Sequence, residues 1–70
     1  MERLGEKLRK LRQQRGLTLR ELAPELGIKS RSHISDMETG KRKPSLDLLV
    51  KIMAYYGVSC DQLLNDEFDL

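Results

Sequence analysis

Hydrophobic residues near the start of the chain recur at the spacing of one helix face. Leu4, Leu8 and Leu11 are separated by four and three positions, which predicts an amphipathic helix over residues 2–15. Gly16 is placed to end this helix. Its polar side is basic, and we expect most of these charges to face solvent. They are Arg3, Lys7, Arg9, Lys10, Arg12 and Arg15.

Residues 18–38 have the pattern of two short helices joined by a tight turn. Thr18 and Glu21 have the spacing of a capping box, in which each side chain bonds a free amide at the start of a helix. The apolar stripe of this helix is Leu22, Ala23 and Leu26. Pro24 is expected to kink it or loosen its second half, and Gly27 to end it in the left-handed conformation.

The second of these helices has one apolar and one polar face. Ser30 is expected to cap it, and Ile34 and Met37 lie three apart on its buried side. At about 100° per residue, the residues pointing away from that side are Ser32, Ser35 and Asp36. Two helices around a glycine turn, with a polar outer face on the second, are typical of a DNA-binding helix-turn-helix.

The remainder of the chain predicts two more helices. Ser45 is expected to cap a helix over residues 46–56, which Gly57 ends. This helix is apolar on more than one side, which suits a buried central helix with an additional apolar strip for a partner. Ser59 and Gln62 have the spacing of a capping box for a short fifth helix.

Cys60 falls in the first turn of that fifth helix. The start of a helix favours thiolates in general, so we consider both a redox-sensing thiol and an inert, partly buried cysteine. Residues 66–70 are an acidic tail with two apolar residues, which suits a frayed end or a dimer contact. Residues 1–65 would then form the folded domain.

The length of 70 residues predicts one domain, with a core near the smallest that folds unaided. It leaves no room for a separate catalytic or ligand-binding domain. The sequence has no apolar run of membrane length and no signal-peptide core. Its one cysteine cannot form an internal disulfide. We therefore expect a cytoplasmic protein of bacterial or phage origin.

The net charge of +2 hides an asymmetry along the chain. Residues 1–43 carry twelve lysines and arginines against six acids, a net +6, whereas residues 44–70 carry one lysine against five acids, a net −4. A basic segment that contains the helix-turn-helix pattern is the electrostatic signature of a phosphate-binding face.

Several short motifs follow one another in the sequence. They are Leu17-Thr18, Glu21-Leu22-Ala23, Leu26-Gly27, Ser30-Arg31-Ser32, Ile34-Ser35, Glu38, the run from Gly40 to Ser45, and Gly57-Val58-Ser59. Together they closely resemble the Cro and phage-repressor type of family, often called XRE, over residues 4–64. The resemblance implies an all-α fold, a compact five-helix domain of the lambda-repressor-like kind, that binds operator DNA, usually as a dimer.

The resemblance also implies roles for residues of the recognition helix and its support. The expected base-contacting set is Arg31, Ser32, Ser35 and Asp36. Arg31 suits a bidentate contact with a guanine edge. Asp36 could accept from a cytosine amino group, although an acid there also repels phosphates. The family further pairs an arginine matching Arg12 with a glutamate matching Glu38, which would hold the recognition helix at a fixed angle.

Phosphate contacts are expected on both sides of the recognition helix. Leu19 stands where the family usually has a phosphate-binding glutamine, so Arg20 or the free amides at the helix start would replace it. The turn is one residue longer than is usual in the family, and Lys29 is the extra residue. It is either a phosphate contact or a neutral insertion. His33 has no second ligand in sight, which favours a phosphate or base-edge contact, or plain solvent exposure, over a metal. The expected set is Thr18, Arg20, Lys29, His33, Lys41, Arg42 and Lys43.

The sequence contains no nucleophile–base pair, metal-ligand cluster or phosphate-cradling glycine loop, so we expect neither an enzyme nor a bound cofactor. The leading hypothesis is a sequence-specific transcriptional regulator, a repressor or autoregulator, that binds a palindromic operator as a homodimer. The dimer would form through residues 44–70, and the expected interface residues are Tyr55, Leu63, Leu64 and Phe68. We expect either Leu63 or Leu64 to belong to the core, which favours Phe68 and the outer face around Tyr55 as the contact. The competing interpretation is that Phe68 folds back over its own domain and that dimers form only on DNA. The alternative is an antitoxin-like or adaptor module that uses the same fold to bind another protein.

Overall fold

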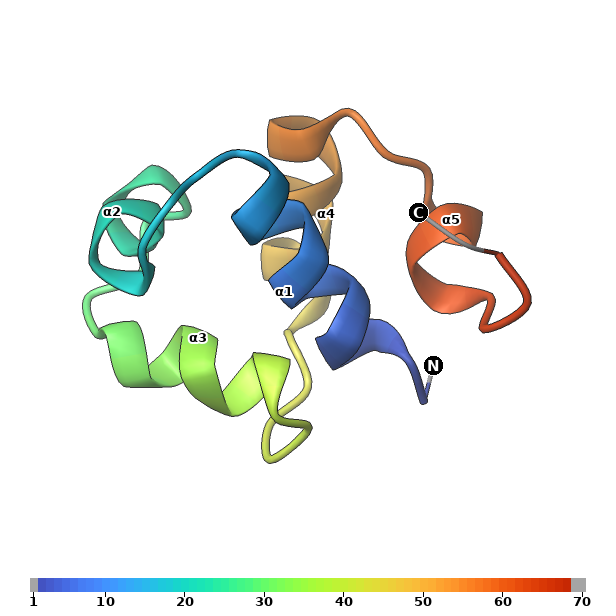
Figure 1. The fold of residues 1–70 in the computed structure, drawn as a ribbon, viewed down its shortest axis with the longest axis horizontal. Coiled ribbons are helices and arrows are strands. Elements are labelled where there is room, and N and C mark those ends of the chain that lie inside the picture. Colours follow the sequence, from blue (N-terminus) through green and yellow to red (C-terminus); the bar gives the residue numbers. More distant parts are fainter. Residues whose placement is uncertain (1, 69–70) are drawn as a thin grey trace.

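The computed structural model describes residues 2–68, and within this range the chain folds into five α-helices without strands (Figure 1). The helices are α1 (Leu4–Gln14), α2 (Leu19–Glu25), α3 (Arg31–Glu38), α4 (Leu46–Tyr56) and α5 (Cys60–Leu64). The expected all-α, five-helix architecture is therefore confirmed. None of the helices in this part of the chain is long and apolar enough to cross a lipid bilayer.

Two capping boxes start helices where the sequence predicted them. The Thr18 hydroxyl accepts from the Glu21 amide at 3.1 Å, and the Glu21 carboxylate accepts from the Thr18 amide at 3.0 Å. Ser59 and Gln62 make the same reciprocal pair at 3.0 and 2.8 Å. Each box satisfies amides that a helix start leaves without partners, which fixes the first residues of α2 and α5.

The first helix is shorter than the hydrophobic pattern predicted, because it starts at Leu4 and not at residue 2. The amides of Glu2 and Arg3 donate to the carboxylate of Asp66, at 3.0 and 2.9 Å. These bonds lower the pKa of Asp66 to about 2, the bond from Arg3 contributing most. A side chain from the far end of the sequence thus caps α1.

Pro24 does not abolish α2, which continues for one residue beyond it, to Glu25. Gly27 then adopts a φ of +68°, and the amide of Ile28 donates to the carbonyl of Ala23 at 2.8 Å. This left-handed glycine closes the helix and turns the chain toward α3.

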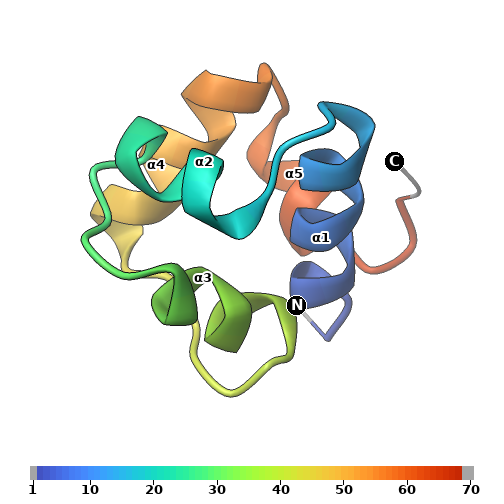
Figure 2. The same cartoon turned by 60° about the vertical axis from the view of Figure 1, so that its left-hand side comes forward.

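All five helices contribute to one apolar core. In Figure 1, α1 and α4 occupy the middle of the molecule, α2 and α3 lie to the left, and α5 lies to the right. A view turned by 60° shows α2 standing over α3 with the tight turn between them (Figure 2). The buried apolar residues are Leu4, Leu8, Leu11, Leu22, Ala23, Leu26, Ile34, Met37, Leu48, Leu49, Ile52, Tyr56 and Leu63.

Candidate nucleic-acid interface

The first turn of α3 is the most open part of the expected recognition helix. Ile34 and Met37 are buried against the core, while Arg31 and Ser32 are exposed. The hydroxyl of Ser30 accepts from the Ser32 amide at 3.3 Å and lies 2.6 Å from the Ser32 hydroxyl. The cap therefore fixes the backbone next to Arg31 and leaves its guanidinium in solvent.

The second turn of α3 is less open than the helical geometry predicted. Ser35 and Asp36 are half-buried, because the chain folds back over them after the helix ends. The amides of Lys41 and Arg42 donate to the Asp36 carbonyl at 2.8 and 3.1 Å. The Thr39 hydroxyl donates to the Ser35 carbonyl at 2.9 Å. Any contact from Ser35 or Asp36 to a ligand is thus more restricted than one from Arg31.

These same bonds hold the basic loop against α3. The side chains of Lys41, Arg42 and Lys43 are all exposed. Because the Lys41 and Arg42 amides are tied to the Asp36 carbonyl, the loop keeps a fixed position relative to the recognition helix. Three cations held beside an exposed helix are suited to bind a phosphate backbone.

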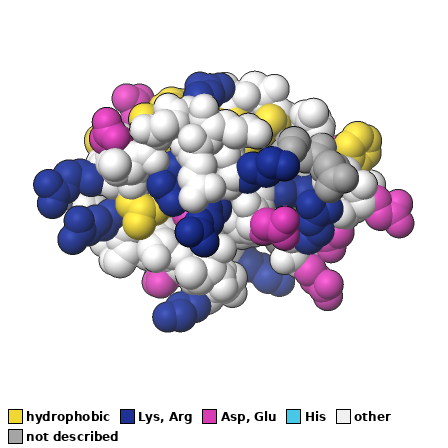
Figure 3. Space-filling view, viewed as in Figure 1, with side chains coloured by type: hydrophobic (Ala, Val, Ile, Leu, Met, Phe, Trp, Pro, Cys, Tyr) yellow, Lys and Arg dark blue, Asp and Glu magenta, His cyan; other side chains and the backbone are white. Residues whose placement is uncertain are grey.

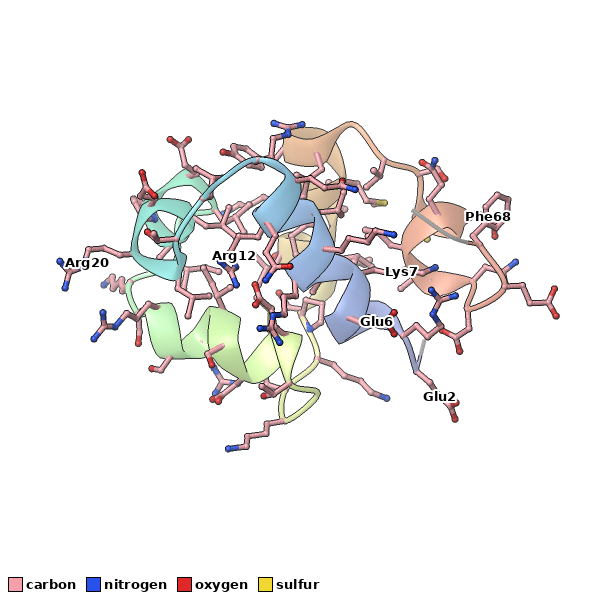
Figure 4. The ribbon with its side chains drawn as sticks, viewed as in Figure 1. Glu2, Glu6, Lys7, Arg12, Arg20 and Phe68 are labelled. Carbon is pink, nitrogen blue, oxygen red and sulfur yellow. The ribbon has the colours of Figure 1, made fainter. Side chains whose placement is uncertain are left out.

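The other expected phosphate-binding residues differ in exposure. Thr18, Arg20 and Lys29 are exposed, and Arg20 projects into solvent from α2 (Figure 4). His33 is half-buried and lines a depression between the turn and the start of α4. It shares this depression with Lys29 and with polar residues of α4, so it lies on a flank of α3.

Arg12 and Glu38 join α1 to the end of α3. The Arg12 Nε donates to Glu38 Oε2 at 2.8 Å and Nη2 donates to Oε1 at 3.1 Å, while Nη1 donates to the Leu17 carbonyl at 2.8 Å. The side chains are only 14% and 7% exposed. The hydrogen bonds to Glu38 raise the pKa of Arg12. The pair therefore ties α1 to the end of α3, with both side chains largely shielded from solvent.

Basic side chains surround α3 and the basic loop. On the face drawn in Figure 3, lysine and arginine side chains project from the left and lower edges, over α2, α3 and the basic loop, and others lie at the top, in the middle and at the right. Acidic side chains gather at the right, over α5 and the start of α1, with a smaller group over α2. The exposed start of α3 therefore lies in the basic part of the molecule, which favours an anionic ligand.

Comparison with known proteins identifies the arrangement. A family model described as Helix-turn-helix matches residues 8–63. The chain belongs to the helix-turn-helix family of the Cro and phage-repressor (XRE) type. The match runs from α1 to α5 and so includes the entire α2–turn–α3 unit.

Three curated relatives illustrate the similarity. The chain is 42% identical to the HTH-type transcriptional regulator DdrOP3 of Deinococcus deserti, over 89% of this chain and 47% of that protein. It is 38% identical to the HTH-type transcriptional regulator ImmR of Bacillus subtilis, over 91% and 50%. It is 40% identical to MJ0272 of Methanocaldococcus jannaschii, an uncharacterized HTH-type transcriptional regulator, over 94% and 98%. The chain thus spans about half the length of the first two relatives.

The C-terminal surface of this family member differs from the expected dimer interface at one residue. Leu63 is completely buried in its own domain, so it has no side-chain surface for a partner. A five-residue helix is too short for periodicity to show which of two adjacent leucines faces inward. Leu64 is half-buried and packs on the core, and Phe68 is 44% exposed. Phe68 lies beyond α5, on the side away from α2 (Figure 4).

Helix α4 exposes apolar residues that the sequence did not single out. Leu46 is 76% exposed and Val50 is 52% exposed. Tyr55, in contrast, is half-buried, and its ring meets that of Tyr56 edge to face at 5.0 Å. The guanidinium of Arg15 lies 5.6 Å from the Tyr55 ring, so this exposed charge also packs beside the aromatic pair.

Lys7 is the clearest departure from the expected solvent-facing charges of α1. It is only 2% exposed, and its ammonium donates to the carbonyls of Gln62 and Asn65 at 2.7 and 2.6 Å. Figure 4 shows the side chain extending from α1 toward α5. Lys7 therefore caps the end of α5, whose last carbonyls lack partners within the helix.

Cys60 is an exposed free thiol, not the partly buried residue that we considered. It is the first residue of α5, and the capping box beside it is made by Ser59 and Gln62. Across residues 2–68, no three histidine, cysteine, aspartate or glutamate side chains are grouped so that they could hold a metal ion.

Proposed function

We propose that the chain is a sequence-specific transcriptional regulator whose α3 enters the major groove of operator DNA. The observation that carries this proposal is the exposed first turn of α3, with Arg31 in solvent and Ile34 and Met37 buried on the opposite side. A basic loop is tied to the other end of the helix through the Asp36 carbonyl. The relatives' names, which describe transcriptional regulators, support the same proposal.

The two kinds of contact have different tasks. Arg31 carries a planar guanidinium that matches the two acceptors of a guanine edge, so it reads sequence. The exposed cations at positions 41–43 bind phosphates and set the register of the domain on the duplex. On the other flank, Arg20 and the first amides of α2 are suited to bind a second phosphate, since the Leu19 side chain cannot supply a hydrogen bond.

An operator selected from a random DNA library tests this division. Arg31→Ala should lose about 1–3 kcal/mol on the selected site and relax the preference at one base pair. Lys43→Ala should weaken selected and random DNA alike, and should reduce the slope of log affinity against log salt by about 0.9. Lys10→Ala, an exposed cation on α1, is the control and should change little. Equal losses on both DNAs with Arg31→Ala would show that Arg31 does not read a base.

We further propose that the regulator is a homodimer on a palindromic operator and acts as a repressor or autoregulator. One recognition helix reads only a few base pairs, and two-fold symmetry doubles that information. The proposed dimer interface lies in residues 44–70, outside the basic half of the chain. Exposed apolar side chains lie there on α4 and after α5. These side chains are Leu46, Val50 and Phe68, with the half-buried Tyr55 and Leu64 beside them.

Sedimentation equilibrium at micromolar concentration tests the dimer. Val50→Glu or Phe68→Glu should shift the protein toward monomer, because either places a charge in the proposed apolar contact. Lys51→Glu, which changes an exposed residue that is already polar, controls for the added acid. A wild-type protein that is monomeric both alone and on a selected operator would exclude the dimer.

The exposure of Leu46 and Val50 also supports a second function, an antitoxin-like or adaptor module that binds another protein. A salt titration of DNA affinity separates the two proposals. A regulator that uses the basic loop shows a steep negative slope, whereas a module that binds only protein shows no specific DNA complex at any salt concentration.

A further inference from the structure

We infer that Gly5 is a positioning residue that sets where α3 lies against the rest of the domain. Gly5 is in the first turn of α1 and faces the end of α3. A Cβ atom built on it would lie 2.6 Å from the carbonyl oxygen of Glu38 and 2.7 Å from that of Met37. Both contacts are with backbone atoms, so no side-chain rotation can relieve them. The inference deepens the proposed function and rests on it for its DNA readout.

The glycine cannot be explained by local helix preference. Glycine inside a helix is clearly less favourable than alanine, and α1 is otherwise built from good helix formers. Alanine would therefore be preferred at this position if there were room for its Cβ. Gly5 lies outside residues 8–63, the range that the family model matches, so the inference rests on the contacts of Gly5 and not on that match.

Gly5 and Arg12 hold the same turn of α3 in different ways. Arg12 binds the Glu38 carboxylate, and Gly5 lets the backbone of α1 approach the Met37 and Glu38 carbonyls. The next residues along the chain fold back on Asp36 and form the basic loop. The distance between α1 and the last turn of α3 thus sets the position of α3 and of the basic loop together.

The displacement caused by a methyl group can be read from these contacts. Real Cβ atoms essentially never come closer than 3.0 Å to another heavy atom and ordinary van der Waals contact begins at 3.4 Å, so an alanine at position 5 requires the Glu38 carbonyl and α1 to separate by about 0.4 Å, and by about 0.8 Å to restore ordinary contact. Donor–acceptor distances of N–H···O hydrogen bonds span only about 0.5 Å. A recognition helix displaced by more than that range loses bidentate base contacts, while phosphate contacts made by long flexible lysines adapt.

The experiment compares wild type, Gly5→Ala and Leu63→Val, a core change in α5 that lowers stability without adding atoms near α3. Affinity is measured for an operator selected with the wild-type protein and for random DNA. Gly5→Ala should lower operator affinity at least tenfold and random-DNA affinity less than threefold. Amide NMR shifts should change along α3 and the basic loop. Leu63→Val should leave the ratio of the two affinities unchanged.

An unchanged affinity ratio together with unmoved α3 amides in Gly5→Ala would overturn the inference. If Gly5→Ala unfolds, the measurements are repeated in trimethylamine N-oxide, which favours the folded state. A variant that stays unfolded there would make Gly5 a requirement for folding and would also overturn the positioning role. If the wild type selects no sequence, the proposed function fails, and the NMR shifts of α3 still test the position of the helix.

Discussion

Breaking the ion pair between Arg12 and Glu38 should cost far more than removing both of its charges. The two side chains are 14% and 7% exposed and are joined by two hydrogen bonds. Removing one partner leaves the other charge buried without its counterion, which costs about 3–5 kcal/mol. A domain of this length has a free energy of unfolding of roughly 4–10 kcal/mol. Either single change should therefore remove a large part of the stability.

The double variant Arg12→Met with Glu38→Leu should recover most of that loss, because two apolar side chains of similar size fill the same space. The recovery is incomplete. The Leu17 carbonyl, which accepts from the Arg12 guanidinium at 2.8 Å, loses this donor, and the lost hydrogen bond costs about 1 kcal/mol of stability. The coupling free energy between the two positions should be at least about 2 kcal/mol.

Urea unfolding of the four proteins measures this coupling, provided that the m-value stays constant. Raising the salt concentration from 0.1 to 0.5 M should change the coupling little, because buried pairs are poorly screened. Glu6→Gln is a control, since its pair with Arg3 spans 3.6 Å with side chains 67% and 35% exposed. It should cost less than about 1 kcal/mol. Additive single effects, or single losses as small as that of the control, would refute the reasoning.

Two further predictions concern the contacts between α1 and the C-terminal segment. Lys7→Met removes the two hydrogen bonds that the ammonium donates to the Gln62 and Asn65 carbonyls, although the Asn65 carbonyl keeps its bond from the Phe68 amide. The change should lower stability by roughly 2–3 kcal/mol, with faster hydrogen exchange confined to α5, and an unchanged melting temperature would contradict it. The pKa of Asp66 is lowered to about 2 from its usual 3.8, so its stabilisation is present above pH 4 and lost as pH falls toward 2. The difference in melting temperature between wild type and Asp66→Ala should therefore shrink over that range, and a constant difference would contradict the prediction.

Features that depend on nearby residues could be predicted from the sequence. The capping boxes join residues three apart, and the buried Ile34 and Met37 follow from helical spacing within one short segment. The left-handed Gly27 is local in the same sense. These elements need no knowledge of the rest of the fold, because the interactions that decide them lie within one or two turns.

Features that depend on contacts between distant segments could not be predicted. Lys7 lies in a basic stretch that looks solvent-exposed. It is buried because Gln62 and Asn65, which are 55 and 58 positions further along the chain, approach its side chain. Gly5 looks like a weak point in a helix until the carbonyls of α3 are placed beside it. The half-burial of Asp36 arises from the loop that folds back over it, which helical geometry alone does not include.

If α3 binds DNA as proposed, these distant contacts give α1 a larger part in recognition than its position suggests. Its exposed charges lie outside the proposed interface, yet Gly5 and Arg12 both act on the last turn of α3. Lys7 and the Asp66 cap fix the same helix to α5, on the opposite side from α3. A rigid helix held at both sides transmits a displacement instead of absorbing it, because close-packed cores have little free volume. Substitutions on the buried side of α1 should therefore alter operator preference, although the proposed interface includes none of these residues.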